Sequence, residues 1–179
     1  PTDPTKPVDP TKPVDPTNPP TGQKGPLSLD VAPVLDFGSH DITDKSQTFT
    51  EEKNSHPYLQ VTDLRGVGDD NKAQGWTVNV SLGDFKDGTK TLVGTTLQFS
   101  NAKVSSTLAD ATGAPVAKDI NLTPGAGKTQ IFRATKDQGL GTWVSVYDPS
   151  NVKLTVPANA QAGSFKSTLT WTMDNSPVA

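Results

Sequence analysis

The chain has 179 residues, a formal net charge of −3 and no cysteine. Its Lys and Arg residues are scattered rather than clustered, which argues against a nucleic-acid groove or a surface for anionic membranes. No apolar run approaches the roughly 20 residues that span a bilayer, so no transmembrane segment is predicted, and a fold without disulfides needs a large apolar core.

The chain begins with a triplet repeat that places proline at every third position from Pro1 to Pro19. The third place of the triplets alternates between Asp and Lys, starting with Asp3 and Lys6. Polyproline II has three residues per turn, so each residue class forms one edge of an extended rod. We favour a spacer of about 55–60 Å over a ligand for a proline-recognising domain, because no aromatic anchor or basic cluster flanks the repeat. The sequence predicts a linker over residues 1–22 and one domain over 23–179.

From Leu27 onward, short segments of alternating apolar and polar residues are separated by Gly, Asp, Asn and Pro, and no amphipathic helix is evident. This pattern predicts an all-β fold, specifically an immunoglobulin-like Greek-key β-sandwich, with a jelly roll as the alternative. The predicted strands are 27–32, 47–51, 58–64, 75–82, 91–99, 103–108, 129–134, 142–147, 152–156 and 163–173.

Two similar tripeptides lie in predicted strands of the domain, Trp76-Thr77-Val78 and, near the carboxyl end, Trp171-Thr172-Met173. In a strand, the Trp and the apolar residue two positions later share one face and the Thr takes the other. Both tryptophans continue apolar rows along their strands, so both are expected to be largely buried and to shape the scaffold.

Trp143 and Tyr147 lie in a segment where Val144 and Val146 occupy the opposite face. If the valines face the core, the two aromatic side chains project outward as a flat platform on which a sugar ring can stack. In the alternative, the aromatic side chains point inward, as large aromatic residues more often do.

Asp63 and Arg65 lie two positions apart in a predicted strand, on the side that carries Leu59 and Val61. A charge on an inward-facing row needs a partner. Arg65 is therefore expected to bridge Asp63 as a structural bracket at the sheet edge. Ligand contact is the other interpretation of this pair.

The sequence offers little for catalysis. His40 and His56, the only histidines, lie in turn-like segments, and no glycine pattern marks a nucleophilic serine. A glycosidase-type carboxylate pair stays open, but the adjacent acidic residues are interpreted as solvated charges, namely Glu51-Glu52 and Asp69-Asp70. The loop 66–75 lacks the spacing of an EF-hand, so a solvated turn is favoured over a calcium site. We predict no enzyme, no cofactor and no metal site.

Several segments of the chain, taken in order, resemble the WxL domain of Gram-positive surface proteins. The likeness runs from Leu27 to Ala179, and a proline-rich spacer is also typical of such proteins. The family's defining leucine is replaced by Val78 in the first tripeptide and by Met173 in the second, and both replacements fill much of the same space. The segments that carry the resemblance are Leu27-Ser28-Leu29-Asp30-Val31-Ala32-Pro33, Leu35-Asp36-Phe37-Gly38, Val61-Thr62-Asp63-Leu64-Arg65-Gly66, Gly75-Trp76-Thr77-Val78-Asn79-Val80, Val152-Lys153-Leu154-Thr155-Val156-Pro157 and Thr168-Leu169-Thr170-Trp171-Thr172-Met173-Asp174.

The resemblance implies a secreted, non-catalytic module at the cell surface that binds peptidoglycan non-covalently. It also implies that Trp76, Val78, Trp171 and Met173 are the motif residues of the domain. Two alternatives stay open: docking of a membrane-anchored WxL-interacting partner by a sheet edge or an apolar patch, and adhesion to host extracellular matrix proteins. No sorting signal is seen at the carboxyl end, which agrees with non-covalent retention.

Overall fold

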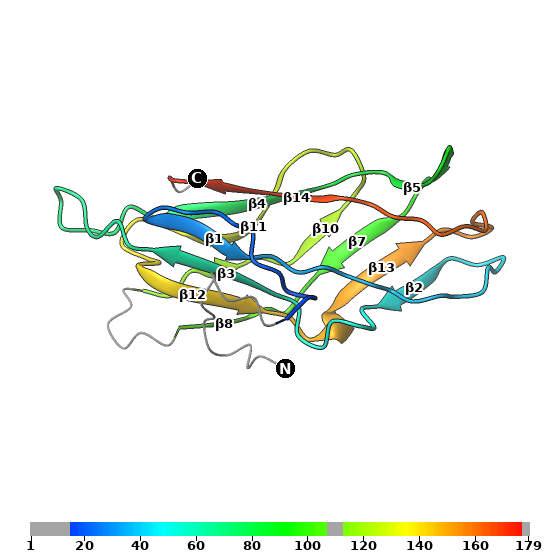
Figure 1. The fold of residues 1–179 in the computed structure, drawn as a ribbon, viewed down its shortest axis with the longest axis horizontal. Helices are drawn as coiled ribbons and strands as arrows, with labels where there is room; N and C mark the ends of the chain where they lie inside the picture. Colours follow the sequence, from blue (N-terminus) through cyan, green and yellow to red (C-terminus); the bar gives the residue numbers. More distant parts are fainter. Residues whose placement is uncertain (1–14, 107–112, 177–179) are drawn as a thin grey trace.

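The computed structural model describes residues 15–106 and 113–176, and strands dominate these ranges (Figure 1). The helical structure within them is a single 3-10 turn, η1, at Pro149–Asn151. The all-β prediction is thereby confirmed. The strands are β1 (Leu27–Val31), β2 (Gln47–Thr50), β3 (Tyr58–Asp63), β4 (Trp76–Leu82), β5 (Phe85–Asp87), β6 (Lys90–Leu92), β7 (Thr96–Phe99), β8 (Lys103–Ser105), β9 (Val116–Ala117), β10 (Ile120–Leu122), β11 (Thr129–Ala134), β12 (Gly141–Val146), β13 (Val152–Val156) and β14 (Leu169–Asp174).

These strands form three four-stranded sheets in which every pairing is antiparallel. We name each sheet after one of its inner strands: the β3 sheet (β1-β3-β12-β8), the β13 sheet (β10-β7-β13-β2) and the β4 sheet (β14-β4-β11-β9). Strands β5 and β6 form a separate hairpin. The Greek-key sandwich and the jelly roll are finer assignments and stay predictions.

Most predicted strands are found close to their expected places, and the differences have local causes. The segment 91–99 forms two strands because the chain turns at Gly94, where φ is +83°. The segment 163–173 becomes regular only at Leu169. The short strands β5, β9 and β10 were not predicted, since two or three residues carry too little alternation to be recognised. The end of the segment 103–108 lies outside the described residues.

The inner faces of the three sheets share one core, and Trp76 lies within it. Trp76 is fully buried, packs edge-on against Phe132 with ring centroids 5.0 Å apart, and donates its indole N–H to the Gly139 carbonyl at 3.1 Å. A Cβ at position 139 would lie 2.4 Å from Cβ of Ala134, so only glycine fits there. Val78 is also fully buried, as the alternation predicts.

Trp143 and Tyr147 are core residues, so the expected outward platform is wrong. Their exposed fractions are 7% and 0%. The inference failed because β12 is an inner strand whose sheet carries buried side chains on both faces. Tyr147 packs edge-on against Phe99 in the main core, with ring centroids 5.3 Å apart, while Val144 on the other face joins a second buried cluster.

The predicted bridge between Arg65 and Asp63 is present and has two parallel hydrogen bonds, Nε to Oδ1 at 2.9 Å and Nη2 to Oδ2 at 2.8 Å. The same guanidinium donates to the carbonyls of Gly75 at 2.6 Å and Asn175 at 2.8 Å. Arg65 therefore joins the end of β3 to the start of β4 and the end of β14. Because Asp63 is 1% exposed, its charge depends on this partner.

The last residues of the predicted spacer contact the domain, so the expectation of an extended rod is wrong there. Asn18 is buried and exchanges two amide hydrogen bonds with Asn54, at 3.0 and 3.1 Å. It also accepts the backbone N–H of Tyr58 at 3.2 Å. Two positions later, Pro20 pairs with Val31 as an antiparallel bridge beside β1. The rod over residues 1–14 lies outside the described residues, and the boundary at residue 22 stays a prediction.

Arg65→Ala should lower the free energy of unfolding by about 3–5 kcal/mol, because it leaves the Asp63 carboxylate buried without its counter-charge. Urea denaturation followed by tryptophan fluorescence measures this change. The control is Lys53→Ala, which removes the exposed ion pair with Asp36 and should shift the transition only slightly. Equal shifts for the two variants would contradict the bracket.

The two tyrosines provide a test of core burial at alkaline pH. Burial disfavours the charged phenolate and raises the pKa of Tyr58 and of Tyr147 from 10.0 to about 12. The stabilisation linked to these groups is complete below pH ~10, the unfolded value, and is lost as the pH rises towards 12. The ultraviolet absorbance of tyrosinate should therefore appear late and together with unfolding. A tyrosine that ionises near pH 10 in the folded protein would contradict this burial.

Candidate functional site

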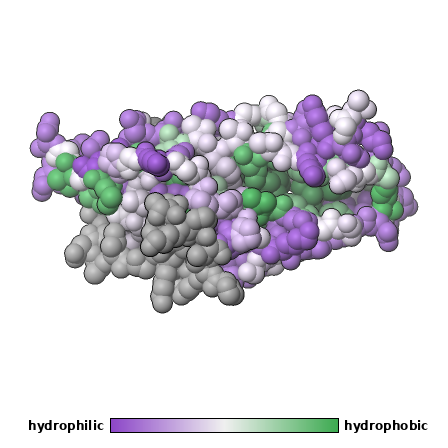
Figure 2. Space-filling model, in the orientation of Figure 1, coloured by the Kyte–Doolittle hydropathy of each residue, from purple (hydrophilic) through white to green (hydrophobic). Residues whose placement is uncertain are grey.

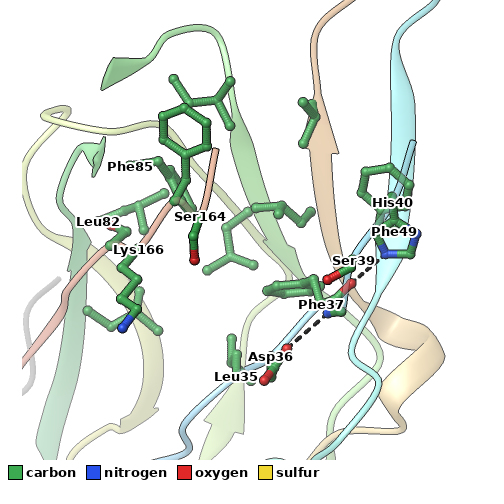
Figure 3. Close-up of a pocket in the computed structure, with 18 of the residues that line it drawn as sticks. Leu35, Asp36, Phe37, Ser39, His40, Phe49, Leu82, Phe85, Ser164 and Lys166 are labelled. Atoms are coloured by element: carbon green, nitrogen blue, oxygen red, sulfur yellow. Dashed lines mark hydrogen bonds between the residues drawn. The ribbon is translucent and has the colours of Figure 1, made fainter. Parts of the chain in front are cut away.

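An open groove with a volume of about 1130 Å³ lies at one end of the molecule (Figure 2). It forms where the β13 sheet continues past the ends of β1 and β3 (Figure 1). There, two chain segments flank its inner face, and residues from the ends of β4 and β14 and from the β5–β6 hairpin also line the groove. We call these segments the first bank, residues 33–43, and the second bank, residues 160–168; Figure 3 shows side chains from both.

The floor of the groove is apolar because strand register places one row of large side chains across the β13 sheet. Phe49 of β2 is opposite Leu154 of β13, which is opposite Leu97 of β7. Aromatic side chains from other segments add to this surface, and the half-buried ones are Phe37, Phe165 and Trp171. Figure 2 shows this apolar hollow between more hydrophilic margins.

Acidic residues fix the backbone of the first bank. The buried carboxylate of Glu51 accepts the N–H of Asp36 at 2.7 Å, and the N–H of Glu52 donates to the Asp36 carbonyl at 3.0 Å. The hydrogen bond from Lys53 holds the pKa of Asp36 below its ordinary value. The interpretation of Glu51 as a solvated charge is therefore wrong, because it organises a loop from within.

His40 extends this bank over Phe49, with stacked rings whose centroids are 3.7 Å apart. Its Nε2 lies 3.2 Å from Oε1 of Glu52. Gly38 passes so close to the same carboxylate that a Cβ there would meet it at 2.1 Å, and its φ of +73° also requires glycine. Contacts with β2 and with the two glutamates that directly follow it thus hold the bank in one shape.

Strand-like pairing with β5 and β4 holds the second bank. Lys166 and Lys86 exchange both backbone hydrogen bonds, at 2.8 and 2.9 Å. The carbonyl of Thr168 accepts the N–H of Gly83 at 2.9 Å, and the Ser167 hydroxyl donates to the Gly83 carbonyl at 2.6 Å. The segment is therefore an extended edge that leads directly into β14.

The two tripeptide motifs have different relations to the groove. Trp171 is half-buried, contacts Phe99 edge-on at 6.3 Å and lines the inner end of the groove. Trp76 and Val78 are sealed in the core, and Met173 is half-buried against it without lining the groove. The remaining candidates do not line the groove either: Trp143, Tyr147, Asp63 and Arg65.

Apart from Trp171, sequence reasoning did not single out the aromatic residues of the groove. Phe49 and Phe165 lay in predicted strands, where an alternating phenylalanine predicts core, and Phe37 lay in a segment without periodicity. The available signal was the segment 33–43, which has several apolar residues but no strand-like alternation.

The described residues hold no cluster of three or more His, Asp or Glu side chains that could bind a metal. In the loop 66–75, Asp70 is paired with Lys136, and Gly68 and Lys72 close a turn at 2.9 Å. Within the ranges that the structure covers, no helix is long and apolar enough to cross a membrane.

Comparison with protein families matches residues 1–177 to the family described as WxL domain surface cell wall-binding. No curated protein and no solved structure matches the chain. The match covers almost the whole chain and confirms the resemblance that the sequence segments carry. The domain is thus a non-catalytic module associated with the cell wall. The chain belongs to the WxL family of surface cell-wall-binding domains.

Proposed function

We propose that the domain attaches its protein non-covalently to peptidoglycan and that the groove is where the polymer binds. The observation that supports this most is the position of Trp171, a motif residue of a wall-binding family, at the inner end of the groove. The first motif lies in the core and supports the scaffold instead.

The shape and chemistry of the groove suit a polymer. Binding sites are concave and mostly apolar, with a few polar groups that set orientation. Here the floor offers rings to the apolar faces of a ligand. Asp36 and Lys166 lie on the banks, and Lys53 pairs with Asp36 beside the first bank. Because the groove is open, a long chain can pass through it without an end having to enter.

Two other functions follow from the sequence: docking of a membrane-anchored surface partner and adhesion to host matrix proteins. Each would also use an exposed apolar surface. They predict that the isolated domain does not sediment with sacculi in the test below, and that it is retained on the partner protein in the absence of wall material.

Phe165→Ser should weaken binding of the isolated domain to purified sacculi by about 10-fold or more, because a buried aromatic contact contributes roughly 1.5–3 kcal/mol. Sedimentation of the domain with increasing amounts of sacculi gives the affinity. Thermal melting of the variant shows whether the fold is kept.

The matched control is Leu64→Ser, which changes an apolar side chain that is 68% exposed, directly follows β3 and does not line the groove. It should bind like the unchanged domain. Undiminished binding by Phe165→Ser would remove the groove from the wall site, and failure of the unchanged domain to sediment would refute attachment itself.

A further inference from the structure

We infer that the groove holds its ligand as an additional extended strand, so that the part of the wall polymer it recognises is the peptide and not the glycan. This inference rests on the proposed function and names the ligand class for the same site. It follows from the backbone groups that the two banks turn towards the groove.

The second bank has one paired edge and one open edge. Both backbone hydrogen bonds of Lys166 go to Lys86 of β5. In an extended chain, neighbouring residues direct their N–H and C=O groups to opposite sides. Those of Phe165 and Ser167 therefore point away from β5, to the side of the groove, and in the described part of the chain they have no hydrogen-bond partner.

The first bank repeats this arrangement. The N–H and C=O groups of Asp36 are both used towards Glu51 and Glu52. Across residues 15–106 and 113–176, the N–H and C=O groups of Leu35 and the N–H of Phe37 have no partner. The two banks that carry these backbone groups flank one apolar floor.

The peptides of peptidoglycan suit such banks better than its sugar chain does. They offer amide N–H and C=O groups at almost every residue, and in an extended chain these groups can turn to both sides. Main-chain hydrogen bonds of this kind give affinity when a peptide adds to an exposed sheet edge. A glycan offers hydroxyl groups and widely spaced acetamido groups, which do not repeat with the period of a strand.

Charge on the second bank agrees with a peptide ligand. Lys166 lines the groove, and among the described residues its ammonium group has no acidic partner. The cross-linking peptides of peptidoglycan carry carboxylates, whereas its amino sugars outside the lactyl groups do not. An ammonium–carboxylate contact at an open site weakens with salt.

The test is competition for binding to sacculi by two soluble fractions of the same wall. One fraction holds the peptides released from the glycan by an amidase, and the other holds the glycan strands stripped of peptide. The peptides should displace the domain at concentrations at least 10-fold lower than the glycan strands. Equal or stronger displacement by the glycan strands, or no displacement by either fraction, would overturn the inference.

A pair of variants at Ser167 tests the backbone contact directly. Ser167→Ala and Ser167→Pro both lose the hydroxyl, but only proline also removes the N–H that faces the groove. Proline is tolerated on an edge strand where its N–H would not pair within the sheet. Ser167→Pro should bind sacculi about 3- to 10-fold more weakly than Ser167→Ala, as expected for one lost hydrogen bond.

Equal affinities of these two folded variants would overturn strand addition. If Ser167→Pro does not fold, the competition experiment decides the question with the unchanged domain. If the unchanged domain does not bind sacculi, the proposed function is refuted. If the glycan strands displace the domain as well as or better than the peptides, only the inference of a peptide ligand is refuted.

Discussion

Packing of Trp76 against Phe132 lies within the one core that the inner faces of three sheets share. The chain has no disulfide to supplement this core, so burial of apolar side chains must hold the sheets together. The core also explains the groove. Where the β13 sheet continues past β1 and β3, those strands no longer cover its apolar face, and two chain segments flank it without closing over it.

The two Trp motifs share one sequence pattern but have different surroundings in the fold. Trp76 is in β4, an inner strand, and is surrounded on all sides. Trp171 is in β14 at the edge of the same sheet and keeps a partly open ring. Their strands are adjacent, with Trp171 opposite Val80. Whether a motif Trp is sealed in the core or lines the groove therefore depends on strand order, which a tripeptide does not encode.

The all-β class, most strands and the Asp63–Arg65 bridge could be predicted from alternation and from the need to pair a buried charge. The outward platform of Trp143 and Tyr147 could not be judged in that way, because alternation assigns residues to faces without saying whether a face is covered. The groove could not be predicted from the sequence for a related reason. Its banks are irregular segments. The shape of the first depends on Glu51 and that of the second on Lys86, and both of these residues belong to other segments of the chain.

The reciprocal amide bonds between Asn18 and Asn54 have a mechanical consequence. A pull applied to the chain at Asp15 reaches this buried pair before it reaches β1, because the pairing of Pro20 with Val31 lies behind it. Among the described residues, the first contacts of this segment with the rest of the domain are therefore made at Thr17 and Asn18, ahead of the pairing with β1. Under shear at the bacterial surface, the load would enter through side-chain amides, and the β3 sheet would be shielded until they part.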